Sequence, residues 1–297
     1  MRDWGNEMKS KGVENNQSEK QANGINVIWK QPVTLNEIRE PLIDGVKFLN
    51  PQYITILRAP SGVGKTMALL YRGLNGEMPY FDENGIMKKN GKPVTGKYKV
   101  FVHECATDQM PSDLIGSYIL RGGDTDFVAS SITSAFKAAS EGERVMLIFD
   151  EINLLRQEVL KSINSVMDDR KYIDSPMGRF SAGDNLILAG TMNSEYDSAG
   201  YDLDPQLRSR AIIPRFDLEK YVTEHKKMFD TFAKLITKTE GAFSIREIEK
   251  QWLFVSVFGM NQQDALYEIL NTYPEELGKK IKENMLLLGV LQAKDKE

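Results

Sequence analysis

Apolar positions in the first two thirds of the chain alternate between strand-length runs and helical spacing. Continuous apolar runs of about four to eight residues are typical of strands buried on both faces of a sheet. Such runs occupy residues 54–57 and 145–149, and further strands are predicted at 98–104, at 186–193 and, more briefly, at 211–213. Helical spacing occupies residues 67–74, 112–118, 127–139 and 158–167. Strands that alternate with helices predict an α/β fold whose strands run parallel.

The two ends of the chain differ from this central pattern. From residue 219 onward the strand signals stop, and helical patterns at 219–236, 245–258, 262–269 and 275–288 predict a helical subdomain over 219–297. Residues 1–24 are polar, with too little apolar surface to offset the entropy of ordering, so we expect a flexible tail. The α/β domain then spans residues 25–218. Within it, turn-forming residues predict a peripheral insertion at 76–96 and a hairpin at 170–183.

A glycine-rich loop joins the first predicted strand of the sheet to a helix. It consists of Ala59, Pro60, Ser61, Gly62, Val63, Gly64, Lys65 and Thr66. In a phosphate-binding loop, backbone N–H groups and the helix N-terminus face the phosphates, while Lys65 would add a full charge and Thr66 a hydroxyl for Mg²⁺. Ala59 stands where the first glycine is usual, and alanine fits there only if its φ is negative.

Polar side chains end two later predicted strands. Asp150 and Glu151 follow the run at 145–149, where Asp150 could hold Mg²⁺ through water and Glu151 could polarise an attacking water. Asn193 ends the run at 186–193 and could bond a γ-phosphate and that water, although asparagine at a strand end is often only a turn former. Together with the loop, these residues predict a site for a nucleotide with Mg²⁺.

Three arginines follow in the sequence. Arg208 and Arg210 precede the short strand at 211–213, and such arginines are usually solvated or locally paired. Alternatively, they could reach the γ-phosphate bound by a neighbouring subunit, which would require a ring. Arg246 lies in the helical region, where it could fold back on the nucleotide or remain in solvent.

Composition narrows the class of protein. The chain has 297 residues and a net charge of -4, which argues against binding nucleic acid through bulk electrostatics. The single cysteine, Cys105, excludes an intramolecular disulfide and fits a reducing cytoplasm, where it would be a small buried hydrophobe. No apolar run approaches the roughly 20 residues that span a bilayer, so we expect no membrane association.

Taken in order, these motifs resemble the AAA+ ATPases, and within them the MoxR, CbbQ, NorQ and dynein-related group. The resemblance covers about residues 54–246 and rests most on DLIGSYILRGGDT at 113–125, FDEIN at 149–153, TMN at 191–193 and LDPQLRSR at 203–210. Two departures concern partners and the last strand: residues 127–130 lack an expected tryptophan, and Ala211 stands where phenylalanine is usual.

The resemblance implies a three-layer sandwich on a parallel five-stranded sheet, followed by a small helical lid. It also implies a helix-2 insert at 119–131 and a hairpin before sensor 1 at 170–183, both facing partners. The implied roles are Walker A for Lys65 and Thr66, Walker B for Asp150 and Glu151, sensor 1 for Asn193, arginine finger for Arg208 or Arg210, and sensor 2 for Arg246.

The leading functional hypothesis is therefore a Mg²⁺-dependent ATPase that forms a homo-oligomeric, hexameric ring and remodels or matures a protein partner as a chaperone. By resemblance, that partner could carry a von Willebrand factor A domain. A first alternative is an ATP-gated assembly scaffold with little turnover, for which Ala59 leaves room. A second is a nucleic-acid-stimulated motor related to restriction NTPases, against which the acidic charge balance argues.

Overall fold

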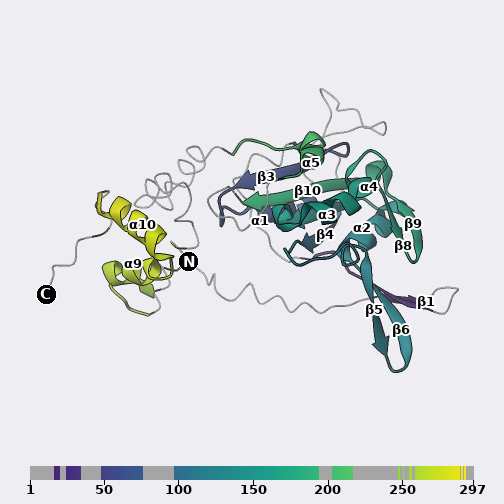
Figure 1. Ribbon diagram of the computed structural model, residues 1–297, viewed down its shortest axis with the longest axis horizontal. Helices are drawn as coiled ribbons and strands as arrows, with labels where there is room; N and C mark the ends of the chain where they lie inside the picture. Colours follow the sequence, from purple (N-terminus) through teal and green to yellow (C-terminus); the bar gives the residue numbers. More distant parts are fainter. Residues whose placement is uncertain are drawn as a thin grey trace.

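The central sheet has five strands, all parallel, in the order β11-β3-β10-β7-β4. The computed structural model describes residues 17–20, 25–34, 48–75, 97–193, 203–216, 247, 250, 254–255, 258–287, 289 and 291. The strands are β3 (Ile54–Ala59), β4 (Lys99–Glu104), β7 (Val145–Asp150), β10 (Leu186–Asn193) and β11 (Ala211–Ile212). The predicted parallel α/β sheet is confirmed (Figure 1).

Helices cover both faces of this sheet, which gives three layers. One face packs Leu57 and Ile148 against Ala68 and Leu69 of α1 (Lys65–Asn75). The opposite face packs against α2 (Ser131–Ser140), α3 (Gln157–Ser162) and α4 (Asn164–Met167). Because both faces are covered, the inner strands are apolar at nearly every position, which explains their continuous runs in the sequence. The helix predicted at 158–167 is interrupted at Ile163.

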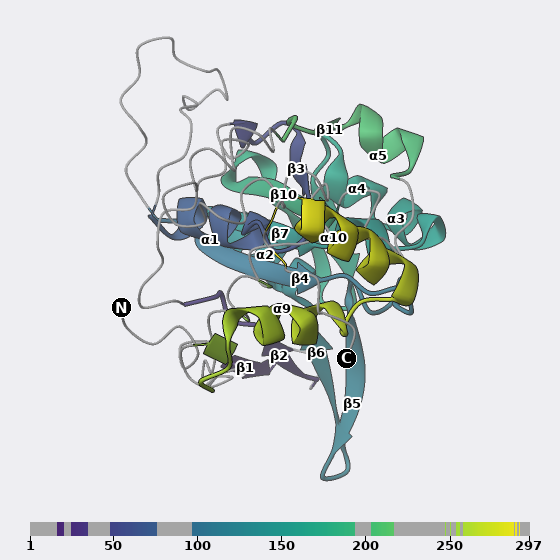
Figure 2. The ribbon, with the colours of Figure 1, turned by 90° about the vertical axis from the view of Figure 1, so that its left-hand side faces the viewer.

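A second sheet has the order β1-β2-β6-β5. Its strands are β1 (Gln17–Lys20), β2 (Asn26–Trp29), β5 (Gly116–Arg121) and β6 (Asp124–Ala129). β2 runs parallel to β6, and the other neighbours are antiparallel. Its small core contains Val27, Trp29, Phe127 and Ala129. The hairpin of β5 and β6 extends away from the central sheet in two views (Figures 1 and 2).

This second sheet corrects three expectations. Residues 17–20 of the expected tail form a strand, residues 116–121 are a strand rather than part of a helix, and α2 begins at Ser131 rather than near residue 127. Gly122 and Gly123 have φ of 61° and 95° and form the turn of the β5–β6 hairpin. The sequence predicts helices on both sides of this turn, where the structure has strands. Ser130 then caps α2 by accepting a hydrogen bond from the Thr133 N–H.

The remaining elements are short. The predicted hairpin is formed by β8 (Tyr172–Ser175) and β9 (Gly178–Ser181), and α5 (Pro205–Ser209) precedes β11. Single 3-10 turns occupy Ile152–Leu154 and Gly183–Asn185. In the C-terminal region α9 (Gln262–Leu270) and α10 (Glu275–Leu287) match two of the four predicted helices. The expected insertion at 76–96 and helix at 219–236 lie outside the described residues.

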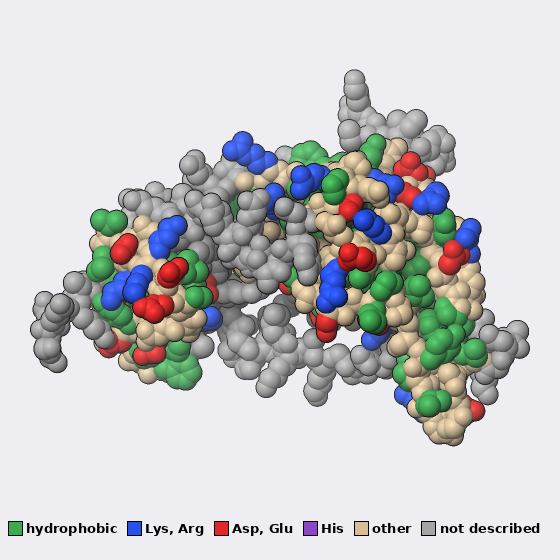
Figure 3. Space-filling view, in the orientation of Figure 1, with side chains coloured by type: hydrophobic (Ala, Val, Ile, Leu, Met, Phe, Trp, Pro, Cys, Tyr) green, Lys and Arg blue, Asp and Glu red, His purple; other side chains and the backbone are tan. Residues whose placement is uncertain are grey.

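The described surface shows where apolar side chains gather. Figure 3 shows them over the β5–β6 hairpin, where Tyr118 is 53% exposed and Leu120 is 82% exposed. Among the described helices, none has the length and apolar character needed to cross a membrane.

Candidate nucleotide-binding site

The glycine loop lies at the carboxyl end of β3, between Ala59 and the start of α1 at Lys65. Gly62 and Gly64 have φ of 79° and 87°, in the left-handed region that glycine adopts at little cost. Ala59 is buried as the last residue of β3, and its φ is not positive. Alanine therefore fits at the position where a glycine is usual.

Lys65 is buried, with 7% of its surface exposed, and its ammonium lies under the loop. Nζ donates hydrogen bonds to the carbonyls of Ala59 at 3.0 Å and Pro60 at 2.9 Å, and to Asn193 Oδ1 at 2.8 Å. Asn193 is within reach because β10 pairs with β3 so that Asn193 lies opposite Ala59. The parallel register thus brings two residues 128 positions apart into contact.

The carboxylates of Asp150 and Glu151 complete this edge of the sheet. The Thr66 hydroxyl donates to Asp150 Oδ1 at 2.7 Å, and Asn193 Nδ2 donates to Glu151 Oε1 at 3.2 Å. Glu151 leaves β7 in a left-handed conformation, with φ of 55° and ψ of 47°. The side chains of Lys65, Thr66, Asp150, Glu151 and Asn193 therefore form one connected group.

Thr191 also belongs to this group, although its sequence context predicts no role for it. Its hydroxyl donates to Asp150 Oδ1 at 2.6 Å and accepts a hydrogen bond from the Glu151 N–H at 2.9 Å. The available signal was a threonine inside an apolar run, two residues before Asn193. Only the pairing of β10 with β7 shows that the hydroxyl faces the carboxylates.

Cys105 follows β4 and contacts the backbone of Asp150. Its N–H donates to the Asp150 carbonyl at 3.0 Å, and its side chain is buried. Burial raises the pKa of the Cys105 thiol, and the negative charges of Asp150 and Glu151 raise it further. The cysteine therefore stays protonated and packs as a small hydrophobe, as its sequence context indicated.

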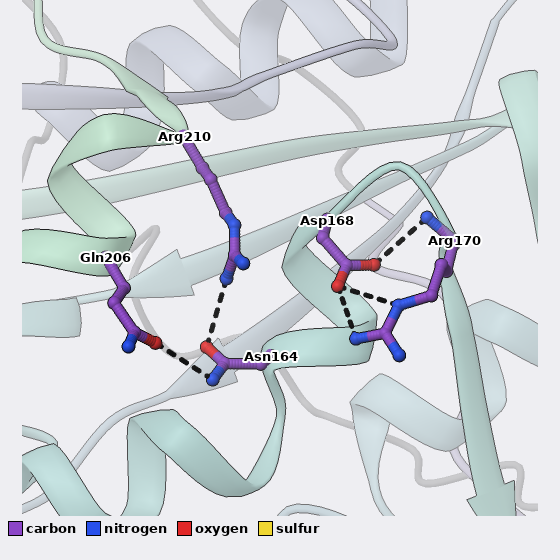
Figure 4. A network of polar contacts seen from close by, with 5 residues as sticks. All are labelled: Asn164, Asp168, Arg170, Gln206 and Arg210. Carbon is purple, nitrogen blue, oxygen red and sulfur yellow. Dashed lines mark hydrogen bonds and ion pairs between the residues drawn. The ribbon is translucent and has the colours of Figure 1, made fainter.

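The two arginines before β11, Arg208 and Arg210, have different surroundings. Arg208 is exposed on α5, whereas Arg210 Nη1 donates to Asn164 Oδ1 of α4 at 3.3 Å (Figure 4). Asn164 in turn donates to Gln206 Oε1 at 3.4 Å. The described contacts of Arg210 thus join α5 to α4 rather than to the glycine loop. Arg246 lies outside the described residues.

The charge of Arg210 also reaches Asp168. The hydrogen bonds from Arg170 are the main cause that lowers the pKa of Asp168, and Arg210 lowers it further. In Figure 4 Arg170 lies against Asp168, with Nε 2.9 Å from Oδ2.

The donor set fits a Mg²⁺ ion that is held jointly with phosphate. Thr66 and Asp150 supply oxygen ligands, which this hard cation prefers. Within the described residues there is no group of three or more His, Cys, Asp or Glu that could hold a metal alone. A metal at this position would therefore depend on the oxygens of a bound nucleotide.

A parallel sheet in which an inner strand, β3, enters a glycine loop, with a lysine, a threonine and strand-end carboxylates around that loop, defines a P-loop nucleotide-binding domain. Residues 92–211 match the family model of the AAA domain of the dynein-related subfamily. This match supports the resemblance of the motifs to the AAA+ ATPases of the MoxR and NorQ type.

Two relatives show how far the likeness extends. The protein NorQ of Paracoccus denitrificans is 26% identical over 171 residues, which cover 57% of this chain and 54% of NorQ. The chain therefore spans about half the length of that relative. The crystal structure of a presumptive ATPase from Cytophaga hutchinsonii is 13% identical, covering 80% of this chain and 72% of that one. Its TM-score of 0.38 is too low to support an argument about the fold.

Proposed function

We propose that this protein hydrolyses ATP with Mg²⁺ at the site formed by residues 59–66, Asp150, Glu151 and Asn193. The observation that carries the proposal is the continuous hydrogen-bonded group that links Lys65, Asn193, Glu151, Thr191, Asp150 and Thr66. A turn that merely resembled a phosphate loop would have no reason to be joined to two carboxylates on another strand. ATP hydrolysis needs this combination of a phosphate cradle, a metal-binding carboxylate and a base.

Each residue has a definite task in this proposal. The loop N–H groups and Lys65 bind the phosphates, while Thr66 and Asp150 hold the Mg²⁺ that neutralises developing charge when it is bound. Glu151 orients and polarises the attacking water, and Asn193 orients Glu151 through its amide. Phosphate binding also requires Lys65 to exchange its present acceptors, and charged oxygens are stronger acceptors than the Asn193 amide.

We further propose that the active form is a homo-oligomeric ring, with six subunits as the expected number. The exposed position of Arg208, and the contact of Arg210 with Asn164 rather than with the loop, support an arginine supplied to a neighbouring subunit. An arginine acting between subunits raises turnover by about 10³- to 10⁵-fold. An arginine that only formed a surface salt bridge would instead contribute to stability, with a median of about 0–1 kcal/mol.

A mixing experiment tests hydrolysis and the ring together. Glu151→Gln should bind ATP normally but release no phosphate, and Arg208→Ala or Arg210→Ala should also lose turnover. Mixing Glu151→Gln with the inactive arginine variant should restore part of the activity, because an intact Glu151 then meets an arginine from its neighbour. Full activity in Glu151→Gln would refute the proposed chemistry. Two inactive variants that stay inactive after mixing would refute the contribution between subunits.

The function that we propose for the ring is remodelling or maturation of a protein partner, in the manner of a chaperone. The exposed apolar side chains of Tyr118 and Leu120, on a hairpin that extends from the domain, support a protein-contacting role. A partner with a von Willebrand factor A domain and a cytoplasmic location are parts of the same proposal. Glu151→Gln with ATP should retain the partner on affinity purification, whereas Lys65→Ala with ATP should not.

The assembly scaffold with little turnover receives less support. The scaffold hypothesis rests on Ala59, which replaces a usual glycine of the loop. Because Ala59 fits at the end of β3 without a positive φ, this replacement gives no reason to expect low turnover. Phosphate release by the wild-type protein distinguishes the two functions directly.

A further inference from the structure

Thr191 lies in the middle of the candidate site and takes no part in binding or chemistry as described so far. Only 1% of its surface is exposed, so its hydroxyl is sealed from solvent. A hydroxyl has one proton to donate, and Thr191 gives it to Asp150 Oδ1 at 2.6 Å. Its oxygen accepts the N–H of Glu151 at 2.9 Å. The Thr191 hydroxyl therefore bonds to two consecutive acidic residues, Asp150 and Glu151.

These two acidic residues need opposite orientations. Consecutive side chains of a strand point to opposite faces, so a second carboxylate that continued β7 would turn away from the loop. Glu151 avoids this by adopting φ of 55° and ψ of 47°, a conformation that non-glycine residues rarely adopt. In that conformation its carboxylate reaches Asn193 Nδ2 at 3.2 Å. The bond from the Glu151 N–H to Thr191 holds the backbone in this state.

The same threonine holds the neighbouring carboxylate. Thr66 and Thr191 both donate to Oδ1 of Asp150, at 2.7 Å and 2.6 Å. Thr66 precedes Asp150 in the sequence, and Thr191 follows it. Two donors on one oxygen fix the rotation of the carboxylate and leave Oδ2 outside these two bonds. Thr66 is the second residue of α1, directly after the glycine loop, whereas Thr191 belongs to β10 of the central sheet.

We propose that Thr191 is a positioning residue that aligns both carboxylates of the site, Asp150 for the metal and Glu151 for the water. This inference rests on the proposed function but adds a residue and a task to it. Thr191 contacts neither nucleotide nor water itself and acts through the two carboxylates. Its removal should therefore impair use of Mg²⁺ and turnover without weakening the phosphate cradle.

The test uses three variants of the full chain. Thr191→Val keeps the shape of the side chain and removes the hydroxyl, whereas Thr191→Ser keeps the hydroxyl. Thr55→Val is the matched control, because Thr55 lies on the adjacent strand β3, is also fully buried, and donates to the Phe48 carbonyl at 3.0 Å. It loses the same kind of hydrogen bond near the amino end of β3, away from the glycine loop.

Three measurements are needed: nucleotide binding without metal, the Mg²⁺ requirement and phosphate release. Binding of a fluorescent ATP analogue in excess chelator should differ by less than about twofold between Thr191→Val and wild type, because the loop is intact. Titrating Mg²⁺ into that complex should require about 10-fold more metal in Thr191→Val, and phosphate release should fall by about 10- to 100-fold, the usual range for residues that orient metal ligands. Thr191→Ser should restore both, and Thr55→Val should change neither.

The outcomes separate this inference from the proposed function. If the wild-type protein binds the analogue with Mg²⁺ but releases no phosphate, the ATPase proposal fails and the metal titration still decides the role of Thr191. An unchanged Mg²⁺ requirement in Thr191→Val overturns the positioning role. So does a loss in Thr55→Val as large as that in Thr191→Val, because the defect would then come from general destabilisation.

Discussion

Lys171 is a buried lysine, 4% exposed, that ties the starting ends of two central strands together. Its ammonium donates to the carbonyls of Pro51, of Gly183 at 3.3 Å and of Leu186 at 3.0 Å. Pro51 lies just before β3, and Leu186 is the first residue of β10. The lysine therefore supports the pairing of β3 with β10, whose opposite ends carry the candidate site.

Lys171→Met keeps the apolar stem and removes all three donors. Hydrogen bonds from a charged group contribute about 1.5–3 kcal/mol each, and the cost of burying the charge offsets part of this. We expect the variant to lose about 3 kcal/mol of unfolding free energy, a large share of the roughly 5–15 kcal/mol typical of a domain.

The loss should depend on pH. Burial lowers the pKa of Lys171 from 10.5 to about 8, although the carboxylates of Asp184 and Asp169 oppose this. In the unfolded chain the lysine regains its ordinary pKa, so between pH 8 and 10.5 the unfolded state binds more protons than the folded state. The free energy of unfolding that this group contributes therefore rises with pH across that window, by up to about 3 kcal/mol. The gap between wild type and Lys171→Met should widen accordingly.

Urea unfolding followed by tryptophan fluorescence measures this gap at about pH 7.5 and about pH 9.5. Lys99→Met is the matched control, because Lys99 is 47% exposed and pairs with Glu143 on the surface at 3.1 Å. It should cost less than about 1 kcal/mol, with the same difference from wild type at both pH values. The reasoning is refuted if Lys171→Met costs no more than the control, or if its gap stays constant or narrows as pH rises.

Three further predictions concern the site and its surroundings. Ala59→Gly should leave nucleotide affinity within about twofold of wild type and cost about 0.5–1 kcal/mol of stability. Gly64→Ala, at φ of 87°, should weaken nucleotide binding in the same titration. An affinity gain in Ala59→Gly would contradict this. Burial lowers the pKa of His103, so wild type should lose stability relative to His103→Gln as pH falls below 6.5; parallel urea midpoints for the two proteins would show otherwise. Arg210→Ala should lower the thermal midpoint by losing its bond to Asn164, while exposed Arg208→Ala should stay within about 0.5 kcal/mol of wild type; equal midpoints would argue against that bond.

The sequence predicted the central sheet well because its strands are buried on both faces. Residues 145–149 have an apolar side chain at every position, and no amphipathic helix would show that pattern. The ends of parallel strands meet at one edge, so the closeness of Lys65, Asp150 and Asn193 followed from the order of elements alone. That inference needed no knowledge of side-chain contacts.

The second sheet could not be predicted in the same way. β5 exposes Tyr118 and Leu120, while β6 buries Phe127 and Ala129 against a strand about 100 residues earlier in the chain. Local spacing at 112–118 and 127–139 fitted a helix, because nothing nearby in sequence reveals the distant partner β2. Thr191 was missed for a related reason, since the direction of a hydroxyl depends on strand pairing.

The pairing of β2 with β6 has a practical consequence for shortened versions of this protein. A gene trimmed to residues 92–211, the segment that the family model matches, would omit β2, β3 and the glycine loop. The backbone of β6 would then lose its partner along one edge, and Phe127 would lose the cover of Val27 and Trp29. Open strand edges recruit strands from other molecules, so the trimmed product should aggregate during expression. β2 therefore helps to keep the domain soluble.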